Sequence, residues 1–314
     1  MASRHDPHSL QGRTFVITGA SSGLGRGVAL KLGARGANLV LLARREDLLE
    51  DVATQARAGG GTVIVVPGDV TQVKDMEALA EAALAPSGRI DVWINNTGIG
   101  AIGHFWDIPA GHHARVIDVN LKGVVYGSLF AIQRFRAQGE GTLVNIGSID
   151  SEVPLAYQAG YSASKAGVLS LGRALNAELK LDGQDRIKVA TVMPWAVDTP
   201  WWEHAANFSG HAPRMAAMDD PDDVVDAIIG IALDPKEELA VGWKAKASYG
   251  SHKLTPDIAE RMSAELAHKS QIRDAPPSPA TDGTLFVAMA SGRGVEGGVR
   301  ERMAREDAAA SNRD

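Results

Sequence analysis

A tyrosine and a lysine stand four residues apart in the run Tyr161-Ser162-Ala163-Ser164-Lys165. Four residues make slightly more than one helical turn, so in a helix the phenol and the ammonium lie on one face and can act on one site. A nearby cation favours the phenolate, and we therefore expect Lys165 to lower the pKa of Tyr161 from about 10. The pair is a candidate acid and base near neutral pH. Such pairs also occur on solvated helix faces, so the upstream residues decide the interpretation.

The elements that must position this pair begin with a strand, a glycine turn and a helix. Thr14 to Thr18 is a β-rich apolar run, and Leu24 to Ala34 has helical spacing. The turn between them lets the backbone approach a pyrophosphate, while the helix N-terminus supplies free N–H groups. Glycine turns also serve plain strand-to-helix packing. The candidate cofactor residues of this turn are Gly19, Ser21, Ser22, Gly23, Leu24 and Gly25.

Two further strands provide candidates for the adenosine end of a dinucleotide. Asn38 to Ala43 ends in Arg44-Arg45, where NAD enzymes tend to place a carboxylate for the ribose 2′-hydroxyl. Two arginines suit a 2′-phosphate instead, so we expect NADP with NAD possible; Arg45 could also simply begin the solvated face of the next helix. A strand over Thr62 to Pro67 leads into Asp69-Val70, a natural place for the adenine edge.

Polar residues then follow two more strands of the predicted sheet. Asp91 to Ile94 ends in Asn95-Asn96-Thr97-Gly98, at the carboxyl end of a strand, where open α/β sheets bind ligands. A helix around Ala114 to Gln138 carries Asn120 in an otherwise apolar stripe. The strand from Gly141 to Ile146 delivers Ser148 just past its end, thirteen residues before Tyr161.

Taken in this order, the glycine turn, Asp69, Asn95 to Gly98, Asn120, Ser148, and Tyr161 with Lys165 resemble the short-chain dehydrogenase/reductase family in its compact single-domain form. The resemblance spans roughly residues 11 to 242. It implies a Rossmann-type α/β fold, a doubly wound parallel sheet of about seven strands with helices on both faces. It also implies an NAD(P)-dependent oxidoreductase that acts on a ketone or secondary alcohol.

The resemblance also implies a role for each residue. Tyr161 would exchange a proton with the substrate oxygen, and Ser148 would hydrogen-bond that oxygen. Lys165 would hold the nicotinamide ribose hydroxyls, and Asn120 would position a water that links Lys165 to solvent. In the run Met193 to Pro200, Pro194, Val197 and Thr199 would contact the nicotinamide. Trp195 stands where glycine is usual, and because tryptophan does not readily take a positive φ, we expect a different loop path there.

The substrate side is suggested by aromatic residues and one acid. Trp106, Trp195, Trp201 and Trp202 fall in loops expected near the pocket mouth, which favours a bulky apolar substrate. The same side chains could instead bury a lid against the core or another subunit. Asp150, two positions after Ser148, could face a hydroxyl or amino group of the substrate. It could equally face solvent or cap a helix.

Composition limits the other possibilities. The chain has 314 residues, no cysteine, a net charge of -6 and scattered basic residues, so we expect small-molecule substrates and no nucleic acid partner. The nine histidines show no metal-ligand spacing, and we assign no metal. A polar N-terminus from Met1 to Arg13 and the absence of a long apolar run predict a cytoplasmic protein without a membrane anchor.

We divide the chain into a dinucleotide-binding and catalytic domain, residues 1–254, and a C-terminal part, residues 255–314. The latter begins with an amphipathic helix, Thr255 to about Gln271, with Ile258, Met262 and Leu266 on one face. The glycine-, alanine- and charge-rich remainder predicts an extended or disordered tail, which could also lie across a neighbouring subunit. Small residues along the Tyr161 helix, namely Ala163, Ala166 and Gly167 together with Leu171, predict a homodimer or homotetramer.

Parts of the pattern also fit two other functions. Ser162 and Lys165 match the S-x-x-K motif of penicillin-recognising acyl enzymes, but S-D-N and K-T-G are missing and the glycine turn would have no role. A dinucleotide-binding regulator without turnover would keep the glycine turn and lose catalytic side chains. Because Asn120, Ser148, Tyr161 and Lys165 are all present, an enzyme is favoured.

Overall fold

A seven-stranded parallel sheet forms the centre of the protein, in the order β3-β2-β1-β4-β6-β7-β9. The computed structural model describes residues 9–311, so most of the polar N-terminal stretch, residues 1–8, lies outside the described part. The expected Rossmann-type sheet is confirmed. Its strands are β1 (Thr14–Thr18), β2 (Asn38–Ala43), β3 (Val63–Pro67), β4 (Val92–Asn95), β6 (Gly141–Ile146), β7 (Ile187–Met193) and β9 (Glu238–Ala240).

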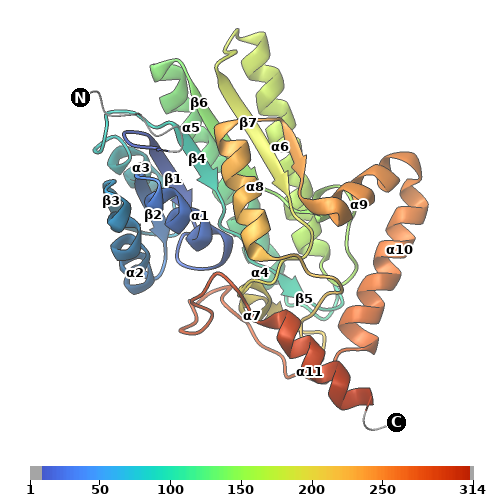
Figure 1. Cartoon of the computed structure of the whole chain (residues 1–314). Helices are drawn as coiled ribbons and strands as arrows, with labels where there is room; N and C mark the ends of the chain where they lie inside the picture. The colour runs from blue at the N-terminus through green and yellow to red at the C-terminus, as the bar shows by residue number, and fades with distance from the viewer. Residues whose placement is uncertain (1–8, 312–314) are drawn as a thin grey trace.

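Helices cover both faces of this sheet because each central strand is apolar on both sides. In β1, Phe15 and Ile17 pack with α1 (Gly23–Ala34), α2 (Glu46–Ala56) and α8 (Pro221–Leu233). Val16 points the other way and belongs to the cluster that includes α3 (Val73–Ala82), α5 (Gly123–Gln138) and α6 (Ala159–Leu181). Figure 1 shows α1 and α8 in front of the sheet, with α5 and α6 behind it.

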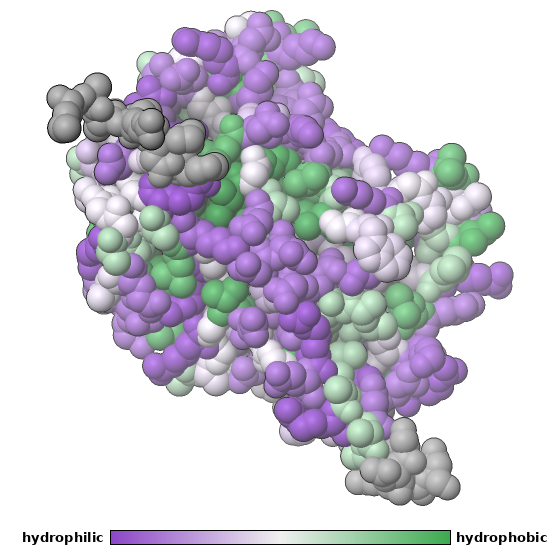
Figure 2. All heavy atoms as spheres, in the orientation of Figure 1, coloured by the Kyte–Doolittle hydropathy of each residue, from purple (hydrophilic) through white to green (hydrophobic). Residues whose placement is uncertain are grey.

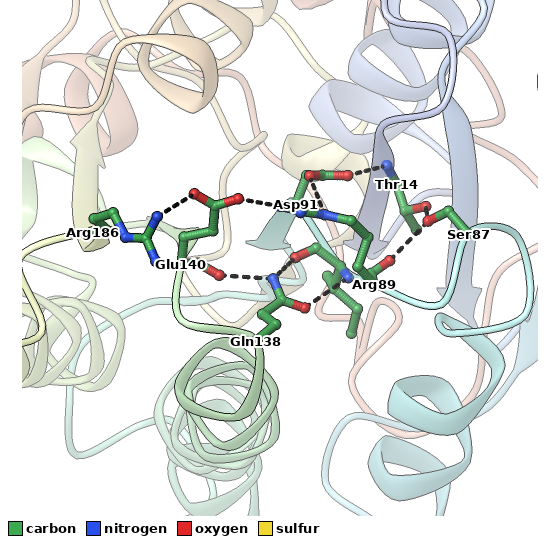
Figure 3. Close-up of polar contacts among 8 residues, drawn as sticks. Thr14, Ser87, Arg89, Asp91, Gln138, Glu140 and Arg186 are labelled. Atoms are coloured by element: carbon green, nitrogen blue, oxygen red, sulfur yellow. Dashed lines mark hydrogen bonds and ion pairs between the residues drawn. The ribbon is translucent and has the colours of Figure 1, made fainter.

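A polar network ties together the amino-terminal ends of the strands, opposite the carboxyl edge (Figure 3). Asp91 accepts a hydrogen bond of 2.7 Å from the backbone N–H of Thr14, and it forms an ion pair of 2.9 Å with Arg89. Arg89 also reaches Glu140 at 2.7 Å, just before β6. The network fixes the starts of β1, β4 and β6 relative to one another, and so the register in which their other ends meet.

Two helices after β9 project from the sheet as a hairpin, α9 (Gly242–Leu254) and α10 (Pro256–His268). The sequence predicted α10 but placed the last strand at 240–242, whereas Gly242, with φ +77°, already begins α9. The expected apolar face of α10 turns inward only at its C-terminal end: Leu266 packs against the cluster that contains Trp202, whereas Ile258 and Met262 are 58% and 65% exposed. Figure 2 shows apolar colouring over this projecting hairpin.

Up to Ser311, the C-terminal part is ordered rather than disordered. It runs extended past the carboxyl edge of the sheet and enters α11 (Val299–Ser311), as Figure 1 shows in red. Arg214 pairs with Glu306 and Asp307 of α11, and the buried carboxylate of Asp198 accepts the backbone N–H groups of Val299 and Arg300. The sequence of this segment has no apolar period because its contacts with distant residues are largely polar, with single buried apolar residues at Leu285 and Val299. Whether the chain divides at residue 254 stays a prediction.

Short elements complete the region beyond the sheet: α4 (Ala110–Ile117), the π turn η2 (Asp118–Lys122), the 3₁₀ turn η3 (Ile149–Ser151), the 3₁₀ turn η1 (Arg57–Gly59), the π turn η4 (Lys269–Arg273), α7 (Trp201–His204), and the two-stranded sheet of β5 (Ala101–Ile102) and β8 (Ala206–Asn207). In the described part of the chain, no helix is both long and apolar enough to cross a membrane.

Candidate active site

Ser148, Tyr161 and Lys165 line one pocket at the carboxyl edge of the sheet. Ser148 directly follows β6 and caps η3, where its hydroxyl accepts a 3.1 Å hydrogen bond from the N–H of Asp150. Tyr161 and Lys165 lie one turn apart near the start of α6. The Lys165 Nζ donates to the carbonyl of Ile146 at 2.7 Å, which anchors α6 to the end of β6. The sequence correctly predicted that these three side chains meet.

The electrostatics of the pocket differ from the sequence prediction. Burial raises the pKa of Tyr161 well above its usual range, and the Asp150 carboxylate raises it further, while the Ser148 hydroxyl opposes both. The sequence predicted that Lys165 would lower the pKa of Tyr161, and this prediction is wrong for the protein without a bound ligand, where the pKa is raised. The ammonium lies over the ring, 5.6 Å from its centroid, and hydrogen-bonds a carbonyl instead.

Asp150 and Lys165 share this enclosed environment. Burial raises the pKa of Asp150 to about 7, although the Lys165 charge opposes the rise. Burial also lowers the pKa of Lys165 to about 8, against the attraction of Asp150. Both groups therefore titrate near neutral pH. Asp150 lines the pocket, so it faces the ligand space rather than solvent, and it lies within the cap made by Ser148.

Asn120 does not line the pocket. It is fully buried in the π turn η2, and its amide donates to the carbonyl of Ile99 and to Ser164 while accepting the N–H of Ile99, at 2.9 to 3.0 Å. The side chain is thus occupied in fixing the chain after β4 against α6. The predicted role of holding a water beside Lys165 stays a prediction, and it would have to use the backbone of η2.

The glycine turn fits a phosphate-bearing cofactor. Gly19, with φ +68°, approaches Thr97 so closely that a Cβ would lie 2.9 Å from the Thr97 Cα. Gly25 does not line the pocket, and a Cβ there would collide with the side chain of Asn96 and the carbonyl of Gly19, so it serves the packing of α1. The buried hydroxyl of Thr97 has no partner among the described residues. Pocket-lining members of the predicted set here are Gly19, Ser21, Ser22, Gly23, Leu24, Asn96, Thr97 and Gly98.

The adenosine end carries the four predicted residues Arg44, Arg45, Asp69 and Val70, all of which line the pocket. Asp69 is held by an ion pair of 2.6 Å with Arg115, a residue of α4 that no sequence motif had indicated. Desolvation lowers the pKa of Arg44 and Arg45, although Arg44 keeps an exposed side. A cationic cluster of this kind favours an anionic group.

The predicted nicotinamide loop also reaches the pocket, with Pro194, Val197 and Thr199 among its lining residues. Trp195 adopts a negative φ and lines the pocket too, with its indole N–H 3.4 Å from the carbonyl of Ala216. The tryptophan thus directs its ring toward the substrate end, where a glycine would leave open space.

Apolar side chains close the substrate end. Trp201 stands edge-on to the Tyr161 ring at 5.2 Å, and Trp202 is buried with its indole N–H bonded to the carbonyl of Val197. Trp106 does not belong to this wall, because it is 78% exposed and stacks on His104. The remaining apolar wall consists of Val153, Leu155, Trp195 and Met215.

Sequence reasoning missed the C-terminal residues of the site, because they lie about 120 residues beyond Tyr161 without a recognisable motif. Thr284, Leu285 and Ala288 line the same pocket as Arg44 and Asp69. The acyl-enzyme alternative is not supported: Ser162 does not line the pocket, and its hydroxyl accepts the N–H of Leu155. In residues 9–311 no cluster of three or more His, Asp or Glu side chains is placed to hold a metal ion.

This fold, with its Ser-Tyr-Lys site at the carboxyl edge, belongs to the short-chain dehydrogenase family, whose model matches residues 13–208. The chain is therefore a short-chain dehydrogenase/reductase, an oxidoreductase. It is 30% identical to the uncharacterized oxidoreductase YxnA of Bacillus subtilis, over 89% of this chain and 79% of the relative. It is 34% identical to 3beta-hydroxysteroid dehydrogenase 1 of Eggerthella lenta, over 72% of this chain and 88% of the relative.

Solved structures agree with this placement. An alcohol dehydrogenase from Thermococcus sibiricus, complexed with 5-hydroxy-NADP, superposes with a TM-score of 0.63 at 26% identity, covering 73% of this chain and 95% of that one. A short chain dehydrogenase/reductase from Burkholderia phymatum, in complex with NAD, gives a TM-score of 0.68 at 26% identity, covering 78% and 96%. Both nicotinamide dinucleotides thus occur among the structural neighbours.

The burial of Asp150 predicts a pH-dependent stability. A carboxyl whose folded pKa is raised from about 3.9 to about 7 favours folding at low pH, and this contribution is lost as pH rises through the folded value. The side chain in Asp150→Asn stays neutral at every pH. Between about pH 4.5 and about pH 7.5, the melting temperature of the variant minus that of the parent protein should therefore rise by several degrees. Scanning calorimetry across this range measures the difference.

The exposed residue Asp107 offers a matched control. For Asp107→Asn the difference in melting temperature from the parent protein should stay nearly constant with pH. A constant difference for Asp150→Asn as well would contradict a raised pKa for the buried Asp150 carboxyl.

Proposed function

We propose that this protein transfers a hydride between NADP(H) and a bulky, mainly apolar ketone or secondary alcohol. The observation that carries the proposal is a single pocket that contains Ser148, Tyr161 and Lys165, with arginines at one end and a tryptophan and methionine wall at the other. Two relatives support the substrate class by name, a 3beta-hydroxysteroid dehydrogenase and an 11-beta-hydroxysteroid dehydrogenase-like protein. A steroid is a bulky apolar alcohol or ketone of this kind.

The side chains favour reduction of the carbonyl. When bound, the nicotinamide supplies the hydride to the carbonyl carbon. Tyr161, whose raised pKa keeps it a neutral phenol near neutral pH, donates its proton to the carbonyl oxygen, and Ser148 hydrogen-bonds that oxygen as its charge grows. Lys165 stabilises the tyrosinate that remains and has N–H donors free of the Ile146 carbonyl for the nicotinamide ribose.

Asp150 adds a carboxyl to a pocket whose lining also includes the polar residues Gln158, Ser248 and Ser263. It lies two residues after Ser148 and lines the same pocket as Tyr161 and Trp195. A hydroxyl or amino group on the substrate would give this buried carboxyl a hydrogen-bond partner in addition to Ser148. We therefore propose substrates with an apolar body and one such polar group near the reacting carbon.

The catalytic assignment is tested with a panel of bulky ketones, steroids included, each with and without a neighbouring hydroxyl. Tyr161→Phe keeps the ring and removes the acid, so single-turnover reduction should fall by at least about 100-fold while NADPH binding is nearly unchanged. Absorbance of NADPH measures the first quantity and its fluorescence the second. A Tyr161→Phe protein that kept most of its rate on every active ketone would refute the assignment.

The same panel tests the Asp150 contact. If hydroxyketones are not preferred, or if Asp150→Ala leaves the ranking of hydroxyketones against plain ketones unaltered, the Asp150 contact is wrong.

The cofactor preference is tested at Arg44. No carboxylate follows β2, and Arg44, Arg45 and Arg115 gather at the adenosine end, so the 2′-phosphate of NADPH should gain charge-assisted contacts that NADH lacks. NADPH should bind at least about 10-fold more tightly, and Arg44→Asp should reverse the order. Fluorescence titration with both nucleotides measures this. Equal affinities, or tighter NADH, in the parent protein would refute the preference.

A homodimer or homotetramer is proposed from the outer faces of two helices. Ala163 and Ala166 of α6 are exposed, as are Val125 and Leu129 of α5, so small and apolar side chains meet solvent behind the sheet. Gly167 does not contribute as expected, because it packs against Leu121 within the chain. Light scattering at micromolar concentration should give at least twice the monomer mass. Ala166→Arg should shift it toward the monomer, and a monomeric parent protein would overturn the proposal.

A further inference from the structure

We propose that residues 282–297, here called the strap, form the outer wall of the cofactor site and must open before a nucleotide can leave. The inference rests on the proposed dinucleotide binding and adds residues that recognise the adenosine half. Strap residues Thr284, Leu285 and Ala288 line the pocket that also contains the glycine turn, Arg44 and Asp69.

The adenosine end of the strap is held by three arginines. Arg44 donates to the carbonyls of Thr284 at 2.6 Å and Phe286 at 3.3 Å, and Arg115 donates to the carbonyl of Leu285 at 2.9 Å. Arg45 reaches the carbonyl of Met289 at 2.9 Å, and its other terminal nitrogen donates to the hydroxyls of Ser21 and Ser22. One guanidinium therefore bridges the strap and the glycine turn across the cleft.

The remaining contacts continue along the cleft to the nicotinamide loop. The N–H of Gly23, at the start of α1, donates to the carbonyl of Gly294 at 2.8 Å. Near the far end the N–H of Gly297 donates to the carbonyl of Asp198 at 3.0 Å. The strap thus crosses from the adenosine end, past the glycine turn, to the loop expected to contact the nicotinamide. Its pocket-lining residues, Thr284, Leu285 and Ala288, lie at the adenosine end of this path.

Glycines allow the strap to lie directly on the backbone that it crosses. A Cβ at Gly283 would overlap the carbonyl of His204, and one at Gly297 would overlap the carbonyl of Thr199. Gly283 also has φ +53°, which favours glycine. The same composition that predicted disorder is therefore what this close crossing requires.

Leu285 is the apolar anchor of the strap at the adenosine end. It is fully buried in the cluster that contains Leu42, Val70 and Val119, and all four side chains line the pocket. Val287, two residues along, is 76% exposed. In a strand, residues two apart would share a face, so the strap bends between Leu285 and Val287 and turns from the cleft toward solvent.

A wall of this kind has a kinetic consequence. A nucleotide beneath the strap is covered on the side by which it would otherwise leave, so release requires the arginine and backbone contacts to break. A change that weakens the wall acts mainly on the dissociation rate. Catalysis at Tyr161 lies at the other end of the pocket and does not need the strap to move.

The test measures release of whichever of NADPH and NADH the parent protein binds more tightly, by stopped-flow displacement. Leu285→Ala should accelerate dissociation by at least about 10-fold, whereas the matched change Val287→Ala should stay within about 2-fold of the parent protein. Unchanged dissociation from Leu285→Ala would overturn the proposal, since the strap would then not contact the nucleotide. Tighter binding by Leu285→Ala would also overturn it, because the strap would then compete with the nucleotide.

Hydrogen exchange on the unmodified protein gives a second measurement that does not depend on how a variant folds. The amides of Thr284 and Gly297, bonded to His204 and Asp198, should exchange more slowly when nucleotide is bound, and faster exchange would refute the wall. Failure of the proposed function looks different: the parent protein would then bind neither nucleotide, before any strap variant is compared.

Discussion

The close junction between the ends of β1 and β4 is the constraint on which the rest of the site depends. The side-chain amide of Asn96 donates to the carbonyls of Thr18 and Gly19, and the Thr18 hydroxyl accepts the N–H groups of Asn96 and Thr97. Strand order reverses at this junction, because β2 and β3 lie to one side of β1 and β4, β6 and β7 to the other. Open α/β sheets bind ligands at such a switch point. The missing side chains of Gly19 and Gly25 leave room for the junction.

The catalytic side chains are subject to a second constraint, because their ionisable groups are buried. Asp150, Tyr161 and Lys165 are enclosed in one pocket, and burial disfavours the ionised form of each. The result is a neutral phenol beside two groups that titrate near neutrality. Such shifts are common where catalysis needs a proton to move at physiological pH. The backbone carbonyl of Ile146 and the hydroxyl of Ser148 hold this arrangement by hydrogen bonds that do not add net charge.

One short segment, Asp198 to His204, connects the two halves of the pocket. Thr199 lies on the nicotinamide side and Trp201 packs against Tyr161 on the substrate side. On its outer surface the Asp198 carboxylate binds the first amides of α11, and the carbonyl of His204 accepts the N–H of Thr284. Backbone hydrogen bonds therefore join the C-terminal chain to the segment that carries Thr199 and Trp201.

By itself the sequence determined the alternation of strands and helices, the parallel sheet and the meeting of Ser148, Tyr161 and Lys165. These follow from local apolar periods and from the geometry of parallel strands, whose carboxyl ends share one edge. Only the tertiary structure decided the sign of the Tyr161 pKa shift, since burial and the neighbouring Asp150 depend on how distant segments enclose the ring. It also decided that Asn120 and Gly25 serve packing, and that the C-terminal chain is a wall of the site. Arg44 lies about 240 residues from its strap partners, and no local pattern can encode a contact between backbone carbonyls and a guanidinium at that separation.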